Sequence, residues 1–321
     1  MNFAFLFHMH DKSIESIPPE SFNPGNYDPA NFAWADFDIS QTAELKTLFA
    51  QLGLPEEETS KILDPKSVFY FQHKQNVFVD HFSVCRKQGK GLTSSPLIIV
   101  MTAHLIVTVH DGPSHYVENV LKVYRDSFQS VGKSPGFIFF LIWDAMIDGF
   151  LPLVFNIDEK LEQLENRYLH GNNSKNILDE IIGTKKMVRT LKHSLAPMQR
   201  SMRHLVSAKL ELISDEARKY LMGHFEHLDR LAGTIDSLQD RVHSTLAGYN
   251  SLLSQQINNS MKILAIIATI MMPLSLLAAI YGTNFKYIPE ITWKYGYFAF
   301  WGVLLFVGFG MLFLFKRKKW L

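Results

Sequence analysis

The sequence predicts an α/β domain, then long stalk helices, then a two-helix transmembrane hairpin at the C-terminus. Three observations predict this order. Short runs rich in β-branched and aromatic residues alternate with helical patterns over residues 1–134. A helical apolar repeat extends over residues 135–260. Two long apolar runs, at residues 262–282 and 295–315, fall within the last segment, 261–321.

The α/β domain contains four candidate strands and three candidate helices. The strands are Phe3–His10, Phe32–Ile39, Val68–Cys85 (a hairpin around Lys74–Asn76) and Leu97–Val109. The helices are Gln41–Leu52, Glu56–Ile62 and Ser114–Phe128. The N-terminal stretch has no basic region before its apolar residues, so we interpret it as a strand and not as a signal peptide.

The run from Gly136 to Phe155 is apolar enough to suggest an additional membrane span. Asp144 and Asp148 lie near its middle. A carboxylate at the centre of a bilayer costs about 2.5–3.5 kcal/mol to insert. We therefore predict that this run is a buried helix outside the membrane, the first helix of the stalk.

Two further long helices are predicted in the stalk. The first, Lys175–Leu212, carries an apolar stripe that consists of Leu178, Ile182, Leu191, Leu195, Met198 and Met202. The second begins at Ser214, a capping residue followed by two acids. From Leu221 to Leu253 its apolar residues recur every three or four positions, and no proline intervenes before Pro273. This spacing indicates a helix that packs along its length and continues into the first membrane span.

The C-terminal hairpin has the length and charge pattern of a membrane segment. Ile263–Ile280 carries no charge, and at about 1.5 Å per residue it spans about 27 Å of a hydrocarbon core of about 30 Å. Basic residues at 316–319, with Lys262, flank the outer ends of the two spans and place both ends on the cytoplasmic side. We expect a multi-pass protein of the inner (plasma) membrane with both termini in the cytoplasm.

The C-terminal segments MKILAIIATIMMPLSLLAAIYGTNF, IPEITWKYGY and FKRKKWL resemble the CorA-type divalent metal cation transporter family. The resemblance is close over the hairpin and looser over the helical region before it. The family signature is Tyr-Gly-Met-Asn after the first span, whereas this chain has Thr283 between Gly282 and Asn284. Gly-x-Asn variants include branches associated with zinc. The resemblance therefore implies divalent-cation transport and leaves magnesium and zinc open.

One hairpin cannot enclose an aqueous path, because two helices leave no lumen. Conduction requires several copies around an axis, with the first span lining the path and the aromatic-rich second span facing lipid. The resemblance implies a homopentamer, so the expected partners are further copies of the chain and the lipid bilayer. The alternative of a plain membrane anchor explains neither the second span nor the polar end of the first.

The resemblance also assigns the site residues. The positions that match the family's pore face are Asn258, Met261, Leu264, Ala268, Met272, Ser275 and Ala279, and helical spacing allows one face to carry most of them. Gly282, Thr283 and Asn284 are the expected selectivity filter. Asn284 would hold the cation through its water shell, because Mg²⁺ dehydrates reluctantly. Ordinary helix packing accounts equally well for the methionines and leucines, and a helix C-terminal stop accounts for Gly and Asn.

Other residues bear on which ion is carried. Lys286 stands where family members often have an acid, and with Lys294 it makes the loop between the spans net positive, which disfavours cation attraction. His224 and His227, three apart on the long helix, form a candidate zinc pair. Two ligands without a third are a weak zinc signal, and solvated or interfacial histidines are the favoured explanation.

Composition and motifs exclude several classes of function. The chain has 32 basic and 31 acidic residues, so it has no large positive net charge that would attract nucleic acid. We therefore expect no nucleic-acid partner. The one cysteine, Cys85, fits a reducing compartment. No phosphate-binding glycine loop, nucleophile elbow or HExxH motif occurs, so we expect no enzyme, no cofactor beside the transported divalent cation, and an electrochemical driving force. A proton-coupled zinc carrier and a non-conducting scaffold or regulator of the same fold remain as alternatives.

Overall fold

The structure, a computed structural model, describes residues 2–18, 21–24, 31–64, 70–74, 77–89, 91–128, 134–170, 176–207, 215–284, 286, 288, 293–318 and 320. The chain forms two units, Met1–Thr245 and Leu246–Leu321. The predicted fold class is confirmed, because the chain has an α/β part, then long helices, then a final apolar helix beside the preceding one. The domain boundaries at residues 134 and 260 stay predictions.

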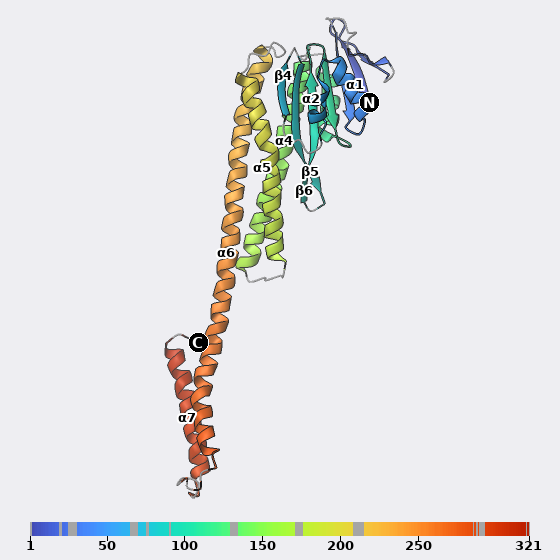
Figure 1. Ribbon diagram of the computed structural model, residues 1–321. Helices are drawn as coiled ribbons and strands as arrows, with labels where there is room; N and C mark the ends of the chain where they lie inside the picture. The colour runs from blue at the N-terminus through green and yellow to red at the C-terminus, as the bar shows by residue number, and fades with distance from the viewer. Residues whose placement is uncertain are drawn as a thin grey trace. The chain divides into compact units, whose positions relative to one another are not determined.

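In the described part of the first unit, seven strands form one mixed sheet (Figure 1). They are β1 (Phe3–His8), β2 (Ile14–Ser16), β3 (Asn31–Asp38), β4 (Tyr70–Lys74), β5 (Val77–Gln88), β6 (Gly91–Met101) and β7 (Leu105–His110). Their spatial order is β2-β1-β3-β7-β6-β5-β4. Among these described strands, β3 and β7 pair in parallel and the other neighbours are antiparallel.

One predicted strand is wrong, because Leu97–Val109 is not continuous. The chain turns between β6 and β7, where the backbone N–H of Thr102 donates to the carbonyl of Leu105 over 2.8 Å. The two strands then pair antiparallel, with Met101 opposite Ile106. The turn contains neither glycine nor proline, so the usual sequence signal for a reversal is missing. The predicted hairpin around Lys74–Asn76 is confirmed by the pairing of β4 with β5.

Helices cover both faces of the sheet. On one face, α1 (Thr42–Gln51) and α2 (Glu56–Ile62) pack through Leu45, Phe49 and Ile62 against a cluster of buried strand residues. The opposite face is covered by α3 (His115–Ser127), α4 (Pro135–Leu169) and α5 (Ile177–Ser207). Strands with buried residues on both faces require such a layer on each side.

Helix α4 contains the apolar run at 136–155 that suggests an additional span. By length and composition it is one of three such helices in the described part of the chain, but 44% of its most apolar window is buried inside the protein. Its rings meet the sheet directly, since Phe139 lies 5.3 Å from Phe78 and Trp143 lies 4.9 Å from Phe82 between ring centroids. Packing against the sheet therefore accounts for the apolar side chains of α4, as expected of a buried helix outside the membrane.

The apolar stripe of α5 is partly wrong in its first two turns. Leu178 and Ile182 are exposed, whereas their neighbours Ile177 and Ile181 are fully buried. The buried face continues through Val188, Leu191, Leu195, Met198 and Met202. Both neighbouring pairs are apolar, so the sequence pattern alone did not distinguish which member faces the core.

Helix α6 (Asp215–Tyr281) is one helix of 67 residues, as the unbroken apolar repeat predicts. In the first unit it is fixed to α4 by charged contacts. Arg241 donates to Asp158 Oδ1 over 2.6 Å and to Glu165 Oε2 over 2.8 Å. Thr245 Oγ1 donates to Glu165 Oε1 over 2.7 Å. The Arg241 guanidinium lowers the pKa of Glu165, so this carboxylate stays ionised and the contact holds one register of α6 on α4.

Candidate ion pathway

The second unit pairs the C-terminal part of α6 with α7 (Gly296–Arg317), which runs alongside it in the opposite direction (Figure 1). The ring of Tyr281 meets that of Phe300 edge-on with centroids 5.1 Å apart. One end of α7 is thereby set beside the C-terminal end of α6. By length and composition both helices could cross a membrane, and only 6% and 0% of their most apolar windows are buried.

One face of α6 packs toward α7. Ile266 is buried, and Ile270, Leu274 and Leu277 are half-buried. These positions recur every three or four residues, so they form a single stripe. A Cβ added at Gly308 of α7 would lie 3.8 Å from Leu274 Cδ1, which shows how closely the two helices approach there.

The predicted pore positions lie on the opposite side of α6. Each of Ala268, Met272 and Ala279 comes two residues after a packed position, which is a rotation of about 200° at about 3.6 residues per turn. All of the predicted set is exposed in a single copy: Asn258, Met261, Leu264, Ala268, Met272, Ser275 and Ala279. No other part of the described second unit therefore covers this face of α6. Ser275 also lines the edge of a groove between α6 and α7.

The predicted filter residues follow immediately where α6 ends. The N–H of Gly282 is shared between the carbonyls of Ala278, at 3.0 Å, and Ala279, at 3.2 Å. Thr283 donates its hydroxyl to the carbonyl of Ile280 over 2.6 Å. The last carbonyls of α6 are thus capped by its own chain. The helix-stop role of these residues is confirmed in this geometry, and the filter role stays a prediction.

Asn284 lies beyond this cap and is exposed, as are Gly282 and Thr283. Among the described residues its carboxamide has no hydrogen-bond partner, so its oxygen is available to water or to the water shell of an ion. Because the Thr283 hydroxyl is turned back to the helix, it is less available than Asn284 to an external ligand. The arrangement offers neutral oxygen ligands at a helix end and no buried charge.

The candidate zinc pair lies elsewhere, in the first unit. His224 Nε2 is 3.4 Å from Asp144 Oδ1 of α4, and its ring lies 4.8 Å from that of Phe140. Burial lowers the pKa of His224 and raises that of Asp144. Within the described part of the chain, no three His, Cys, Asp or Glu side chains are placed to share a metal ion. The spacing of the two histidines did not indicate Asp144 as a partner, because Asp144 lies on another helix. A zinc role for His224 and His227 stays a prediction.

The chain is similar in sequence to a known protein family and to individual members of it. A family model described as "CorA-like Mg2+ transporter protein" matches residues 29–317. YfjQ of Bacillus subtilis (strain 168) is 28% identical over 299 residues, which cover 89% of this chain and 89% of YfjQ. The cobalt/magnesium transport protein CorA of Thermotoga maritima is 32% identical over 189 residues, which cover 59% of this chain and 54% of that protein.

A solved structure shares the whole fold. The complete structure of the CorA magnesium transporter from Methanocaldococcus jannaschii superposes with a TM-score of 0.86 and covers 100% of this chain and 99% of that chain. The two sequences are 18% identical in the superposition. At that identity the similarity shows the fold, including the C-terminal helix pair, and not the ion.

Proposed function

The chain belongs to the family of CorA-like Mg²⁺ transporter proteins, and we propose that it carries divalent metal cations across a membrane as a homo-oligomer. The observation that carries the proposal is the division of α6 into two opposite faces. One face packs toward α7 through residues such as Ile266 and Ile270, and the other is exposed through residues such as Ala268 and Met272. A ring of copies with that second face inward would enclose a path, whereas one copy encloses none.

Five copies are the number that the family resemblance implies, and the pore residues are those of the exposed face. The carbonyl oxygens at Gly282 and the carboxamide of Asn284 would then form neutral rings at one end of the path. Such rings suit a cation that keeps its water shell, because waters bridge the ion to oxygen ligands. Apolar positions such as Met272 would form constrictions that close the path by dewetting.

The driving force in this proposal is the membrane potential. An inside-negative potential favours entry of a divalent cation by about 4.6 kcal/mol per 100 mV, twice the value for a single charge. The Thermotoga maritima relative is named for cobalt and magnesium transport, which favours uptake of these ions over a scaffold role. Thr283, in place of the methionine of the family motif, keeps zinc among the candidates.

Uptake of Mg²⁺ and Zn²⁺ into liposomes tests this proposal. We expect purified protein in liposomes to take up Mg²⁺ or Zn²⁺ when an inside-negative potential is imposed, and Thr283→Met to raise the ratio of Mg²⁺ to Zn²⁺ uptake several-fold. Restoring methionine removes a hydroxyl that caps the Ile280 carbonyl and recreates the family's magnesium-type motif. Fluorescent indicators inside the vesicles measure both ions, and repeating the assay across a pH gradient identifies proton coupling.

The same assay separates the alternative function. A scaffold or regulator that kept the fold would pass neither ion at any potential, although it would assemble and insert normally. Absence of uptake in vesicles that contain correctly assembled oligomers would therefore overturn the proposed transport. A ratio unchanged by Thr283→Met would leave transport standing and remove Thr283 from ion choice.

In the proposed topology the protein spans the inner (plasma) membrane. Both termini lie in the cytoplasm, and the residues between α6 and α7 lie outside. We expect a cysteine at Lys294 to react with an impermeant thiol reagent applied to intact cells, and a cysteine at Lys318 to react only after permeabilisation. The native Cys85 does not interfere, because it is buried and burial raises the pKa of its thiol to about 11. The reverse labelling pattern would contradict this orientation.

A further inference from the structure

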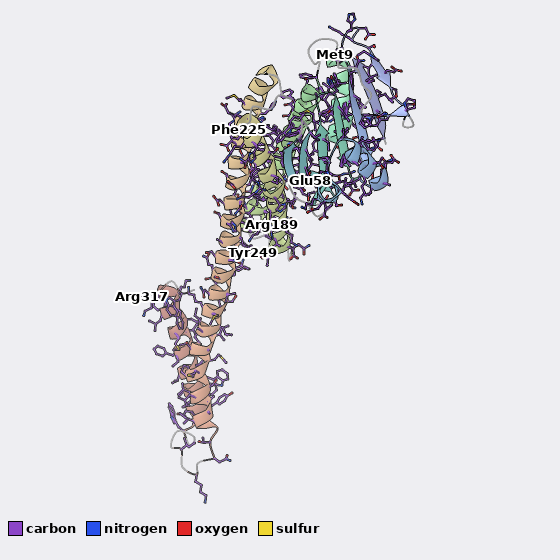
Figure 2. The ribbon with its side chains drawn as sticks, turned by 45° about the horizontal axis from the view of Figure 1, so that its top comes forward. Met9, Glu58, Arg189, Phe225, Tyr249 and Arg317 are labelled. Carbon is purple, nitrogen blue, oxygen red and sulfur yellow. The ribbon has the colours of Figure 1, made fainter. Side chains whose placement is uncertain are left out.

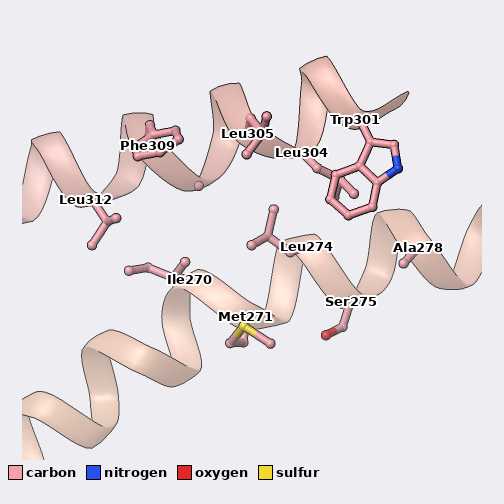
Figure 3. A pocket seen from close by; sticks show the side chains of 11 residues that line it. Ile270, Met271, Leu274, Ser275, Ala278, Trp301, Leu304, Leu305, Phe309 and Leu312 are labelled. Carbon is pink, nitrogen blue, oxygen red and sulfur yellow. The ribbon is translucent and has the colours of Figure 1, made fainter. Parts of the chain in front are cut away.

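An apolar groove of about 490 Å³ lies between α6 and α7 in the second unit. Helix α6 contributes Ile270, Leu274 and Ala278, and α7 contributes Trp301, Gly308 and Leu312, among others. Figure 3 shows the two rows facing one another, with the indole of Trp301 closing one end. The missing side chain at Gly308 helps to keep the groove open, since its Cβ would meet only Leu274.

The length of the groove matches one leaflet of a bilayer. From Trp301 to Leu312 the chain advances eleven residues, which is about 16 Å along a helix. Half of a hydrocarbon core of about 30 Å is about 15 Å. The Leu312 end lies one helical turn before Lys316. Trp301, at the other end, lies 15 residues or about 22 Å from Lys316, so the groove begins one helical turn inside the charged end of α7 and crosses the middle of the membrane.

Cations gather at the Leu312 end of the groove. Lys316, Arg317 and Lys318 are exposed at the end of α7, where Figure 2 labels Arg317. The pairing of Gly308 with Leu274 and of Phe300 with Tyr281 sets an antiparallel register. Continued along the helices, this register places Lys262 of α6 level with the residues just after Arg317. We call Lys262, Lys316, Arg317 and Lys318 the basic collar.

We propose that the groove and the basic collar together bind one anionic phospholipid per chain, from the leaflet on the collar side. An acyl chain occupies the groove, and the headgroup phosphate contacts the collar. Charge complementarity selects this occupant. Copies of the chain around one axis would bring their collars to the same depth, where like charges repel, and anionic headgroups between them would offset that repulsion. This site goes beyond the ion path, and its test does not depend on ion flux.

Lipid retention by the intact, full-length oligomer tests the proposal. The protein is purified from vesicles of phosphatidylglycerol and phosphatidylcholine in equal amounts, and bound lipid is counted by native mass spectrometry. We expect about one phosphatidylglycerol per chain, retained at least tenfold over phosphatidylcholine, because each basic residue near a membrane surface favours anionic lipid by about fivefold. Equal retention of the two lipids by the unmodified protein would overturn the proposal.

Variants separate the groove from the collar. Gly308→Leu fills the groove and should lower retained lipid at least tenfold. Gly302→Leu is the matched control on the same helix, since it does not line the groove and its Cβ would meet nothing within 4 Å. Lys316→Gln with Arg317→Gln should abolish the preference for phosphatidylglycerol, whereas Lys294→Gln, at the other end of α7, should preserve it. Unchanged retention in Gly308→Leu would contradict the site.

A second measurement needs no bulky variant. Phosphatidylglycerol with bromine atoms near the end of its acyl chain should quench Trp301 fluorescence when present as a minor lipid in phosphatidylcholine. Trp301→Phe should remove that quenching, because the other four tryptophans do not line the groove. Absence of Trp301 quenching in the unmodified protein would show that no phosphatidylglycerol chain occupies the groove, and the lipid proposal would fail.

Discussion

Asn284→Ala is expected to abolish saturable divalent-cation uptake, with at least a tenfold fall in initial rate, while the oligomer stays assembled. A methyl group cannot accept a hydrogen bond from the water shell of an ion, so a ring of such residues loses its ligands in every copy at once. Stability should change little, because Asn284 is exposed and has no hydrogen-bond partner among the described residues. Surface changes of this kind usually stay within about 0.5 kcal/mol.

Two further variants sharpen this experiment. Asn259→Ala removes the same carboxamide from an exposed position of α6 next to Asn258 but rotated about 100° away from it, and it should transport normally. Asn284→Asp keeps the oxygen ligands and adds one negative charge per copy, so it should retain flux with altered ion selectivity. Uptake in liposomes and native mass measurement report on transport and assembly separately. Saturable uptake at the normal rate in Asn284→Ala would exclude Gly282–Asn284 as the filter.

Met272→Lys is expected to insert and assemble like the unmodified protein and to transport no divalent cation. If Met272 lines an aqueous path, the new ammonium groups are hydrated there, and one positive charge per copy repels a divalent cation from the path. If Met272 instead faced lipid, each lysine would cost about 2.5–3.5 kcal/mol near the bilayer centre and would impair insertion. The pore-facing orientation therefore predicts an assembled protein without transport, whereas the lipid-facing orientation predicts a loss of inserted protein.

Phe306→Lys supplies the comparison for a lipid-facing position. Phe306 of α7 is 81% exposed and does not line the groove between α6 and α7. We expect its membrane-inserted yield to fall several-fold, while Met272→Lys is recovered at a normal level. Met272→Gln, a neutral polar change, should restore conduction and raise basal leak by wetting the constriction. Equal insertion defects in the two lysine variants would move Met272 off the pore face.

Features that depend only on the order of residues along the chain could be predicted before any contact was known. The uncharged length of Ile263–Ile280 can be measured against a bilayer without knowing any contact. The uninterrupted repeat before Pro273 predicted one long helix, and α6 is one helix from Asp215 to Tyr281. The helix stop at Gly282–Asn284 was likewise readable, because small and polar residues end helices through local hydrogen bonds.

Which of several apolar neighbours faces which partner depends on packing between helices and could not be predicted from periodicity. In α5, Ile181 is buried and Ile182 is exposed, although either could have faced the core. In α6, apolar residues surround the whole membrane segment, so periodicity cannot separate the face toward α7 from the face opposite it. Packing separates them, because Ile266 and Ile270 lie against α7 while Met272 stands free.

Contacts between distant parts of the chain were also beyond the sequence. His224 was paired in the sequence analysis with its neighbour His227, yet its closest charged partner is Asp144 on another helix. The strand break at Thr102 depends on a backbone hydrogen bond to Leu105 and on the antiparallel pairing that follows it, not on a turn residue. Burial and hydrogen bonding between helices and strands determine these contacts. The residues that meet are far apart in the sequence, so no pattern along the chain relates them.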